Sequence, residues 1–267
     1  MLLRDVEYAK PASLPDALSA LAAHDGARAL AGGQTLINVM KARAASPDVL
    51  VDLNGLEELK GIELAGDGTL TIGAMTTYSE LMESAEAKAR PILAEVVSTI
   101  ADVQVRNRGT VGGNVCANDP TNHLPPLMAA VGARFTIAGG SGEREVTAED
   151  FFLGVYLTAV GPGELLTKIA IPAGKHDGFA AITLGVDGTC IANAAASLNG
   201  SLRVALGCVD AVPVVLQPAS TEEDAVRAAV HAANLDPPSD VHASAEYRTH
   251  LAEVLAVRAA RQAQENA

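Results

Sequence analysis

Cysteine is scarce in this sequence of 267 residues, which contains three: Cys116, Cys190 and Cys208. Cysteines so few and so far apart along the chain do not make a disulfide framework, a C-x-x-C redox pair or a four-thiolate metal site. These absences exclude the disulfide-rich secreted domains, and a reducing compartment fits the sequence best.

Aromatic residues and positive charge are also scarce. Aromatics make up 3% of the chain and Trp is absent, so the core must be built from Ala, Val, Leu and Ile. Nineteen basic against 32 acidic side chains give a formal net charge of −13. A surface this negative repels phosphate backbones and anionic lipids, which excludes nonspecific binding to nucleic acid or to a membrane surface.

Long apolar runs are missing as well. No stretch approaches 18 uncharged apolar residues, and Arg4, Asp5 and Glu7 place charges where a signal peptide needs an apolar run. We therefore expect a cytoplasmic globular protein with no membrane span. The length is sufficient for one large or two modest domains with a real core.

Turn and capping signals predict an α+β fold in two domains, 1–172 and 175–267, separated at Pro172-Ala173-Gly174. The second domain is expected to be an antiparallel meander, with turns at Asp187-Gly188 and Asn199-Gly200, closed by two helices. We expect the first helix to begin with Ser13 as its N-cap and a later one to begin at Thr77 with Glu80, and we expect hairpin turns at 66–68 and 139–142. Helices are expected over 13–26, 35–43, from 77, over 92–100, from 221 and over 244–262, and strands over 27–31, 49–53, 62–64, 70–72, 134–138, 165–171, 194–198 and 202–206.

The most informative segment is Ala31-Gly32-Gly33-Gln34-Thr35-Leu36-Ile37, between a predicted strand and a predicted helix. Adjacent glycines let the backbone approach a ligand closely, and the next three N–H groups would point outward from the helix start. This is the geometry of an anion nest that holds a pyrophosphate. An ordinary glycine turn before a helix cap is the competing interpretation, and this segment alone favours it.

A second glycine pair changes that balance. It lies in Arg106-Asn107-Arg108-Gly109-Thr110-Val111-Gly112-Gly113-Asn114, which brings two arginines and several hydrogen-bonding side chains into an acidic chain. Residues 106–126 show neither helical nor strand periodicity, so we expect a long functional loop. Neither segment matches a P-loop, and no G-x-G-x-x-G follows the first strand. The remaining interpretation is a dinucleotide site formed by two separate glycine loops.

Together these segments resemble a known family. Both glycine loops, Thr71-Ile72-Gly73-Ala74 between them, and Asp119-Pro120-Thr121-Asn122-His123-Leu124-Pro125-Pro126-Leu127 after them resemble the FAD-binding medium subunit of the molybdenum hydroxylases. This is the flavin subunit of the carbon monoxide dehydrogenase and xanthine dehydrogenase group. Ala245-Glu246-Tyr247-Arg248 is similar to the last helix of that family, so the resemblance runs nearly from end to end.

The resemblance implies a fold and a set of FAD-binding residues. Residues 1–172 would form the two-lobed FAD-binding domain of the vanillyl-alcohol oxidase type, with lobes of about 1–55 and 56–172, and 175–267 the C-terminal domain of the CO dehydrogenase flavoprotein type. The first loop would bind the pyrophosphate through backbone amides, and the second would approach the pyrophosphate and ribityl chain from the other lobe. Asp119 would bond a flavin hydroxyl or the polar edge of the ring. The implied residues are Ala31, Gly32, Gly33, Gln34, Thr35, Leu36, Thr110, Gly112, Gly113, Asn114, Asp119 and His123.

The resemblance also implies an oxidoreductase complex. A large subunit with a molybdenum cofactor would oxidise the substrate, and a small subunit would relay the electrons through two [2Fe–2S] clusters. FAD on this chain would pass them to an external acceptor, such as NAD or a quinone, in a dimer of heterotrimers. The three cysteines agree with this arrangement, because the clusters must then lie on a partner. They argue against the related benzoyl-CoA reductase branch, whose flavin subunit carries an inserted four-cysteine cluster.

Two residues depart from the family pattern. His123 stands where many relatives have an acid before Leu-Pro, so either a lost carboxylate contact or a neutral hydrogen-bonding role is open there. Phe179 stands where the family often has a Tyr beside the isoalloxazine, and the Lys that accompanies it is absent. The side chain that would stack on the ring therefore stays open.

Two other functions are compatible with the same flavin fold. A stand-alone flavin oxidase would act directly on a small organic substrate, but it needs a substrate domain over the ring, and the C-terminal domain is small for that purpose. An assembly subunit with a vestigial nucleotide site would take up no FAD. The identity of the substrate is not encoded in this chain if a partner subunit binds it.

Overall fold

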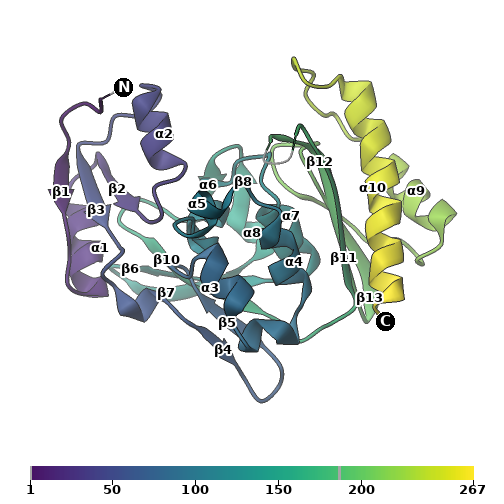
Figure 1. Cartoon of the computed structure of the whole chain (residues 1–267), viewed down its shortest axis with the longest axis horizontal. Helices are drawn as coiled ribbons and strands as arrows, with labels where there is room; N and C mark the ends of the chain where they lie inside the picture. The colour runs from purple at the N-terminus through teal and green to yellow at the C-terminus, as the bar shows by residue number, and fades with distance from the viewer. Residues whose placement is uncertain (1, 186–187) are drawn as a thin grey trace.

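The computed structural model describes residues 2–185 and 188–267, which form an N-terminal lobe, a middle lobe and a C-terminal domain in a row (Figure 1). The N-terminal lobe holds a parallel three-stranded sheet in the order β1-β3-β2. Parallel strands need crossover connections, and the helix α1 lies in the connection from β1 to β2. Ser13 caps α1 as predicted, because its side chain accepts a hydrogen bond from the Asp16 N–H. The bounds are β1 Glu7–Ala9, α1 Leu14–Ala23, β2 Ala27–Leu30, α2 Leu36–Lys41 and β3 Val49–Asp52.

Five antiparallel strands form the sheet of the middle lobe, in the order β4-β5-β10-β6-β7. Both expected hairpins are present, since Leu64 pairs with Leu70 and Gly139 pairs with Gly142. Phe135 and Phe151 stack in the core beneath the sheet, with ring centroids 4.0 Å apart. The strands are β4 Ile62–Leu64, β5 Leu70–Gly73, β6 Arg134–Gly139, β7 Gly142–Thr147 and β10 Leu165–Ile171, with a separate pair β8 Phe152–Gly154 and β9 Leu157–Thr158.

Short helices lie between this sheet and the sheet of the C-terminal domain, and residues of both sheets share one buried core with them. The first of them begins with a capping box between Thr77 and Glu80, the residues that predicted its start. The helices are α3 Tyr78–Glu83, α4 Ile92–Ser98, α5 Val103–Arg106, α6 Val111–Ala117, α7 Leu124–Ala130 and α8 Ala148–Phe151, with 3₁₀ turns at Glu57–Leu59 and Glu86–Ala89.

The long loop predicted between residues 106 and 126 is wrong. Helix α6 lies inside it, and Thr110 caps this helix by accepting a hydrogen bond from the Gly113 N–H at 3.0 Å. Helix α7 begins at Leu124, so the irregular part shrinks to residues 118–123. Two glycines and an asparagine lower the helix propensity of α6, and a helix of seven residues shows too few turns for an apolar period to be visible.

The C-terminal domain is the predicted meander, with strand order β11-β12-β13-β14. The turn at Asn199-Gly200 is present between β12 and β13, whereas Asp187 of the other predicted turn lies outside the described residues. Helix α10 covers β11 and β12 (Figure 1) with a face rich in buried alanine. None of the helices in the described part of the chain is long and apolar enough to cross a membrane. The bounds are β11 Asp177–Thr183, β12 Cys190–Asn199, β13 Ser201–Gly207, β14 Val214–Leu216, α9 Glu223–Ala232 and α10 Ala245–Glu265.

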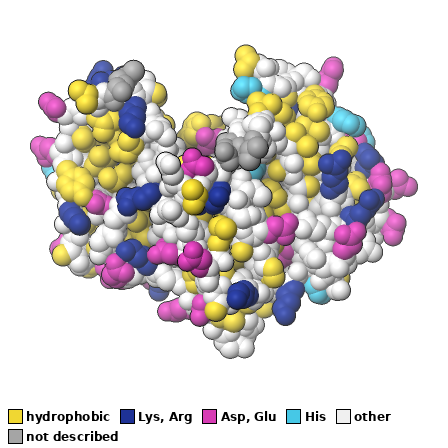
Figure 2. Space-filling view, in the orientation of Figure 1, with side chains coloured by type: hydrophobic (Ala, Val, Ile, Leu, Met, Phe, Trp, Pro, Cys, Tyr) yellow, Lys and Arg dark blue, Asp and Glu magenta, His cyan; other side chains and the backbone are white. Residues whose placement is uncertain are grey.

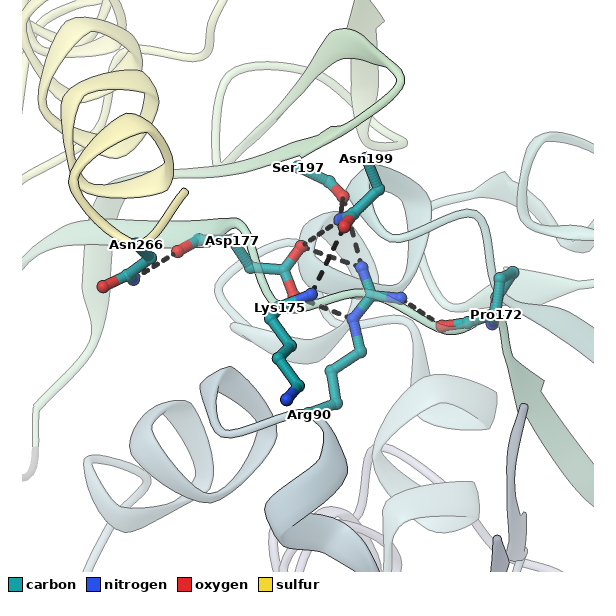
Figure 3. A network of polar contacts seen from close by, with 7 residues as sticks. All are labelled: Arg90, Pro172, Lys175, Asp177, Ser197, Asn199 and Asn266. Atoms are coloured by element: carbon teal, nitrogen blue, oxygen red, sulfur yellow. Dashed lines mark hydrogen bonds and ion pairs between the residues drawn. The ribbon is translucent and has the colours of Figure 1, made fainter. Parts of the chain in front are cut away.

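A buried ion pair joins the middle lobe to the C-terminal domain (Figure 3). Arg90, just before α4, donates through Nε and Nη2 to both carboxylate oxygens of Asp177, at 2.7 and 2.8 Å. The two side chains are 2% and 1% exposed. Arg90 also donates to the Pro172 carbonyl oxygen and to Ser197, while Asn199 donates to Asp177 at 3.2 Å. Because every charged atom has a partner, the pair holds the two domains in one orientation.

Candidate functional site

A cavity of about 830 Å³ lies between the N-terminal lobe and the middle lobe. Figure 2 shows the outline of the molecule hollowed between the N-terminal lobe and the C-terminal domain. The wall is formed by β2 and the first glycine segment, the chain from β5 into α3, the second glycine segment, and residues within 156–166. Ten of the twelve residues predicted to bind FAD lie in this wall: Ala31, Gly32, Gly33, Gln34, Thr35, Leu36, Thr110, Gly112, Gly113 and Asn114.

The first glycine segment turns directly into α2, with its backbone donors free. The Ile37 N–H bonds to the Gly33 carbonyl and the Val39 N–H to the Thr35 carbonyl. Within the described chain, the N–H groups of Gln34, Thr35 and Leu36 have no protein acceptor. These three adjacent donors at a helix start have the chemistry of an anion site.

A hydrogen-bond chain supports this segment from behind. Asn54 donates through Nδ2 to the Ala31 carbonyl at 3.1 Å, and Asp52 accepts from both the backbone N–H and the side chain of Asn54, at 2.9 and 2.6 Å. The Tyr8 hydroxyl donates to the other Asp52 oxygen. Burial raises the pKa of Asp52, but the hydrogen bonds from Tyr8 and Asn54 outweigh it, and the net pKa is lowered. Asp52 is therefore an ionised anchor for the loop.

The second glycine segment meets the first from the opposite lobe. A Cβ at Gly32 would overlap the carbonyl oxygen of Arg108 in the other lobe. A Cβ at Gly112 would lie 2.5 Å from the carbonyl oxygen of Ala74, which belongs to the same lobe. Only a residue without Cβ permits such contacts between main chains. A Cβ at Gly113 would lie 3.6 Å from the Ala31 Cβ, so the two glycine segments face each other across a narrow gap.

An unpartnered polar atom lies in the cavity wall. Oδ1 of Asn114, on α6, is buried and has no hydrogen-bond donor among the described residues. Burial raises the pKa of the nearby Tyr78 to about 12, against a smaller opposing effect of a hydrogen bond donated by the Asn114 side chain. Because a buried acceptor without a donor is costly, this atom fits a ligand that offers a hydroxyl or an N–H group. Free backbone donors, an unpartnered amide oxygen and glycine contacts together fit FAD, which carries both a pyrophosphate and a hydroxylated chain.

The charge around the cavity differs from what the sequence suggested. Arg106 donates to the carbonyl oxygens of Ile100 and Ala101, and neither it nor Arg108 lines the cavity. The arginine in the wall is Arg28, on β2. Glu164 also lines the wall. Burial raises its pKa, but the hydrogen bonds from Arg144 and Gly161 together outweigh burial, so the net pKa is lowered and the carboxylate is ionised. The attraction for an anion thus comes mainly from the backbone.

Asp119 and His123 lie outside the cavity wall. Asp119 accepts from the Thr121 N–H at 2.9 Å and from the hydroxyl of Tyr156, which does line the cavity, at 3.2 Å. His123 is buried, with its ring 5.2 Å from that of Phe179 and its Nδ1 3.2 Å from Asn193 Nδ2. Neither residue is among those that line this cavity, so their predicted contacts with the flavin stay predictions.

Sequence reasoning missed one whole side of the cavity. Residues within 156–166 supply it, from Tyr156 just before β9 to Leu166 in β10. The turn Gly161-Pro162-Gly163 was a usable signal, because glycine and proline clusters between apolar runs mark loops. Asn54 carried no sequence signal, since its role depends on a contact with a distant carbonyl. No group of three or more His, Cys, Asp or Glu side chains in the described residues is placed to hold a metal ion.

Comparison with known proteins agrees with this geometry. The family model "FAD binding domain in molybdopterin dehydrogenase" matches residues 4–174, and "CO dehydrogenase flavoprotein C-terminal domain" matches residues 175–263. The chain therefore belongs to the FAD-binding medium-subunit family of the molybdenum hydroxylases. The resemblance noted from the motifs and the predicted two-domain α+β fold are both confirmed.

Individual relatives cover the whole chain. The carbon monoxide dehydrogenase medium chain of Afipia carboxidovorans is 36% identical over 291 residues, covering 100% of this chain and 99% of the relative. The solved structure of reconstituted CO dehydrogenase from Oligotropha carboxidovorans matches with a TM-score of 0.93 and 36% identity, over 100% of both chains. Quinoline 2-oxidoreductase from Pseudomonas putida 86 matches with a TM-score of 0.91 and 32% identity, over 100% of this chain and 99% of that one.

Proposed function

We propose that this chain is the electron-transferring FAD subunit of a cytoplasmic, three-subunit molybdenum hydroxylase. Electrons would arrive from [2Fe–2S] clusters on a small partner subunit, which receives them from substrate oxidation on a large molybdenum subunit. They would leave from the flavin to an external acceptor, and two heterotrimers would associate. The observation that carries the proposal is the cavity lined by both glycine segments, in a chain of this family.

The residues divide the task of holding FAD. The N–H groups of Gln34, Thr35 and Leu36 bind the pyrophosphate, and the unpartnered oxygen of Asn114 accepts a hydroxyl of the ribityl chain. Gly32 brings the two lobes close enough to enclose the cofactor, and Gly112 lets α6 pack directly on the main chain at Ala74 within the middle lobe. The flavin, when bound, supplies the two-electron and one-electron redox chemistry. The protein contributes position, exclusion of water and electrostatics.

Partner subunits are part of the proposal because of what this chain lacks. Its three cysteines cannot ligate two clusters, and the described residues offer no cluster of metal ligands. An electron relay also needs no catalytic triad or paired carboxylates on this chain.

Two substitutions at one residue test the anion site. Gly33→Asp places a carboxylate in the ring of free N–H groups, and Gly33→Asn places a neutral side chain of the same shape there. Gly33 has φ of +74°, a conformation that Asp and Asn tolerate comparably, so the pair isolates charge. We expect Gly33→Asp to weaken FAD binding at least tenfold more than Gly33→Asn, measured by flavin fluorescence on reconstitution of the apoprotein. Equal affinities of the two variants would refute the pyrophosphate assignment.

The direction of electron flow is tested separately with the FAD-loaded chain. Under anaerobic conditions, stopped-flow absorbance should show flavin reduction by a reduced [2Fe–2S] partner subunit and none by small organic substrates alone. Direct reduction by an organic substrate would support a stand-alone oxidase instead. Purified chain that never takes up FAD would support the vestigial assembly subunit.

A further inference from the structure

Two cysteines that are distant in the sequence meet in the C-terminal domain. Cys190 begins β12 and Cys208 follows β13, and the hairpin between these strands brings them to the same end of the sheet. Nδ2 of Asn193 lies 3.4 Å from the Cys190 sulfur and 3.8 Å from the Cys208 sulfur. Both thiols are free and buried, 2% and 4% exposed. The amide nitrogen of Asn193 thus contacts the sulfur atoms of both cysteines.

The same amide joins the thiols to an imidazole. Nδ2 of Asn193 is also 3.2 Å from His123 Nδ1 and 3.3 Å from the Asn122 carbonyl oxygen. Asn193 is fully buried, and its Oδ1 has no partner among the described residues. A structural core would place apolar side chains here, because an unpartnered buried acceptor costs free energy. The cluster has the composition of a chemically active site.

The two thiols differ in acidity. A hydrogen bond from the Cys208 thiol lowers the pKa of Cys190 to about 5, against the opposing effect of burial and with further lowering by His123. The pKa of Cys208 is raised well above its usual value, first through the same hydrogen bond. Cys190 is therefore the more acidic thiol of the pair, and the thiolate is the nucleophilic form.

The backbone around the pair departs from regular sheet geometry. Cys208 has φ of +65°, a left-handed conformation that is unfavourable for a residue with a Cβ. The register of β11 against β12 shifts beside Cys190, where Thr183 pairs with it. In a regular strand, alternation between the two faces sets the direction of each side chain, and these two irregularities break that alternation at Cys190 and Cys208. Each cysteine therefore lies at a departure from regular strand geometry.

We propose that Cys190 and Cys208 are a redox-active pair that hydrogen peroxide converts reversibly to a disulfide. The Cys190 thiolate attacks one oxygen of the peroxide, the O–O bond breaks, and the departing hydroxide takes a proton to leave as water. The resulting sulfenic acid is attacked by the Cys208 sulfur, which forms the S–S bond, gives up its proton and releases a second water. Two thiols and one peroxide thus become one disulfide and two waters, and a dithiol reductant reverses the change.

The third cysteine, Cys116, differs from the pair in its surroundings, because it is half-buried and lines the large cavity. Cys208 lines a small pocket of about 10 Å³ together with Asp119 and the exposed residues Asp210 and Ala211, which is room for a molecule of about the size of water. Burial raises the pKa of Cys116 to about 12, so its thiol stays protonated. Cys116 is the internal control for general oxidation.

Peptide mapping of the full-length chain tests the proposal. The protein is treated with hydrogen peroxide well below its unfolding temperature, its remaining thiols are alkylated, and it is digested with trypsin. Cleavage after Arg203 separates Cys190 from Cys208, while Cys116 lies between cleavage sites at Arg108 and Arg134. We expect the peptides of Cys190 and Cys208 to be linked, the link to disappear with dithiothreitol, and Cys116 to be alkylated throughout.

Variants establish the order of the steps. Cys208→Ser should accumulate a sulfenic acid at Cys190 that dimedone traps, while Cys190→Ser should give no trapped product at Cys208, and Cys116→Ser should form the disulfide as the parent does. Near-ultraviolet circular dichroism before and after treatment monitors the fold. The proposal is wrong if Cys190 and Cys208 stay alkylatable in the folded protein, if both are oxidised without linking, or if the link forms only on unfolding. FAD binding takes no part in this readout, so its result is independent of the proposed function.

Discussion

Asp52 shows how a single side chain supports a binding loop that it does not touch. It receives hydrogen bonds from Tyr8 and from two groups of Asn54, and Asn54 in turn holds the Ala31 carbonyl at the entrance of the first glycine segment. Tyr8, Asp52 and Ala31 lie in or next to three different strands, so sequence spacing gives no hint of the arrangement. The loop is thus preorganised by a charge placed behind it.

The lowered pKa of Asp52 predicts a pH-dependent contribution to stability. Replacement Asp52→Asn removes the charge-assisted hydrogen bonds and should cost about 1.5 to 3 kcal/mol at neutral pH. Because the folded-state pKa lies below the usual value of 3.8, this stability is fully present above 3.8 and is lost as the pH falls through the folded pKa. Urea unfolding of parent and variant should give a free-energy difference that narrows in acid. The exposed carboxylate of Asp25 supplies the control, and the Asp25→Asn change should cost much less. A difference that widens in acid would contradict the assignment.

Single side chains also show where sequence reasoning stops. The arginines beside the second glycine segment were natural candidates for an anion site, yet the Arg106 guanidinium instead binds two carbonyl oxygens near the end of α4. The two cysteines of the C-terminal domain were treated as scattered, and a hairpin joins them. Residue type and spacing predict which chemical groups a segment offers to a binding site. Tertiary packing decides where a long side chain points and which distant side chains meet.

At the scale of elements, the sequence predicted those with strong local signals. The capping residues Ser13 and Thr77 marked helix starts that the structure contains. The paired turn residues between β4 and β5, and between β12 and β13, marked both hairpins. Helix α6 was missed because its glycines serve tertiary contacts rather than local propensity. Its helical form depends on the packing of Gly112 against Ala74, which no local rule contains.

The cap of α6 gives a prediction at this scale. The Thr110 hydroxyl is 3.0 Å from the Gly113 N–H, which it satisfies at the helix start. Thr110→Ala should destabilise the protein by about 0.5 to 2 kcal/mol, whereas Thr110→Ser keeps the cap and should cost much less. Chemical denaturation followed by circular dichroism measures both. If serine were as costly as alanine, packing of the methyl group rather than the hydrogen bond would hold the helix start.

For the whole molecule, the ion pair between Arg90 and Asp177 fixes how the C-terminal domain meets the middle lobe (Figure 3). Arg90→Ala leaves the Asp177 carboxylate buried without its partner and should cost about 3 to 5 kcal/mol. The double variant Arg90→Met with Asp177→Leu removes both charges and should recover much of that loss. Calorimetry of the parent, of Arg90→Met and Asp177→Leu singly, and of the double variant measures the coupling. Additive losses would mean that the two side chains act independently.

The contact between Gly32 and the Arg108 carbonyl, where two lobes meet without side chains, also constrains the evolutionary history of the protein. No substitution at Gly32 is neutral, because even alanine pushes one lobe away from the other. Gly66 and Gly140 have open space around them and can drift freely. Among descendants of this chain, the outer surface can therefore diverge widely while Gly32 stays fixed. The seam between the lobes will preserve the ancestry of the protein after most of its sequence has changed.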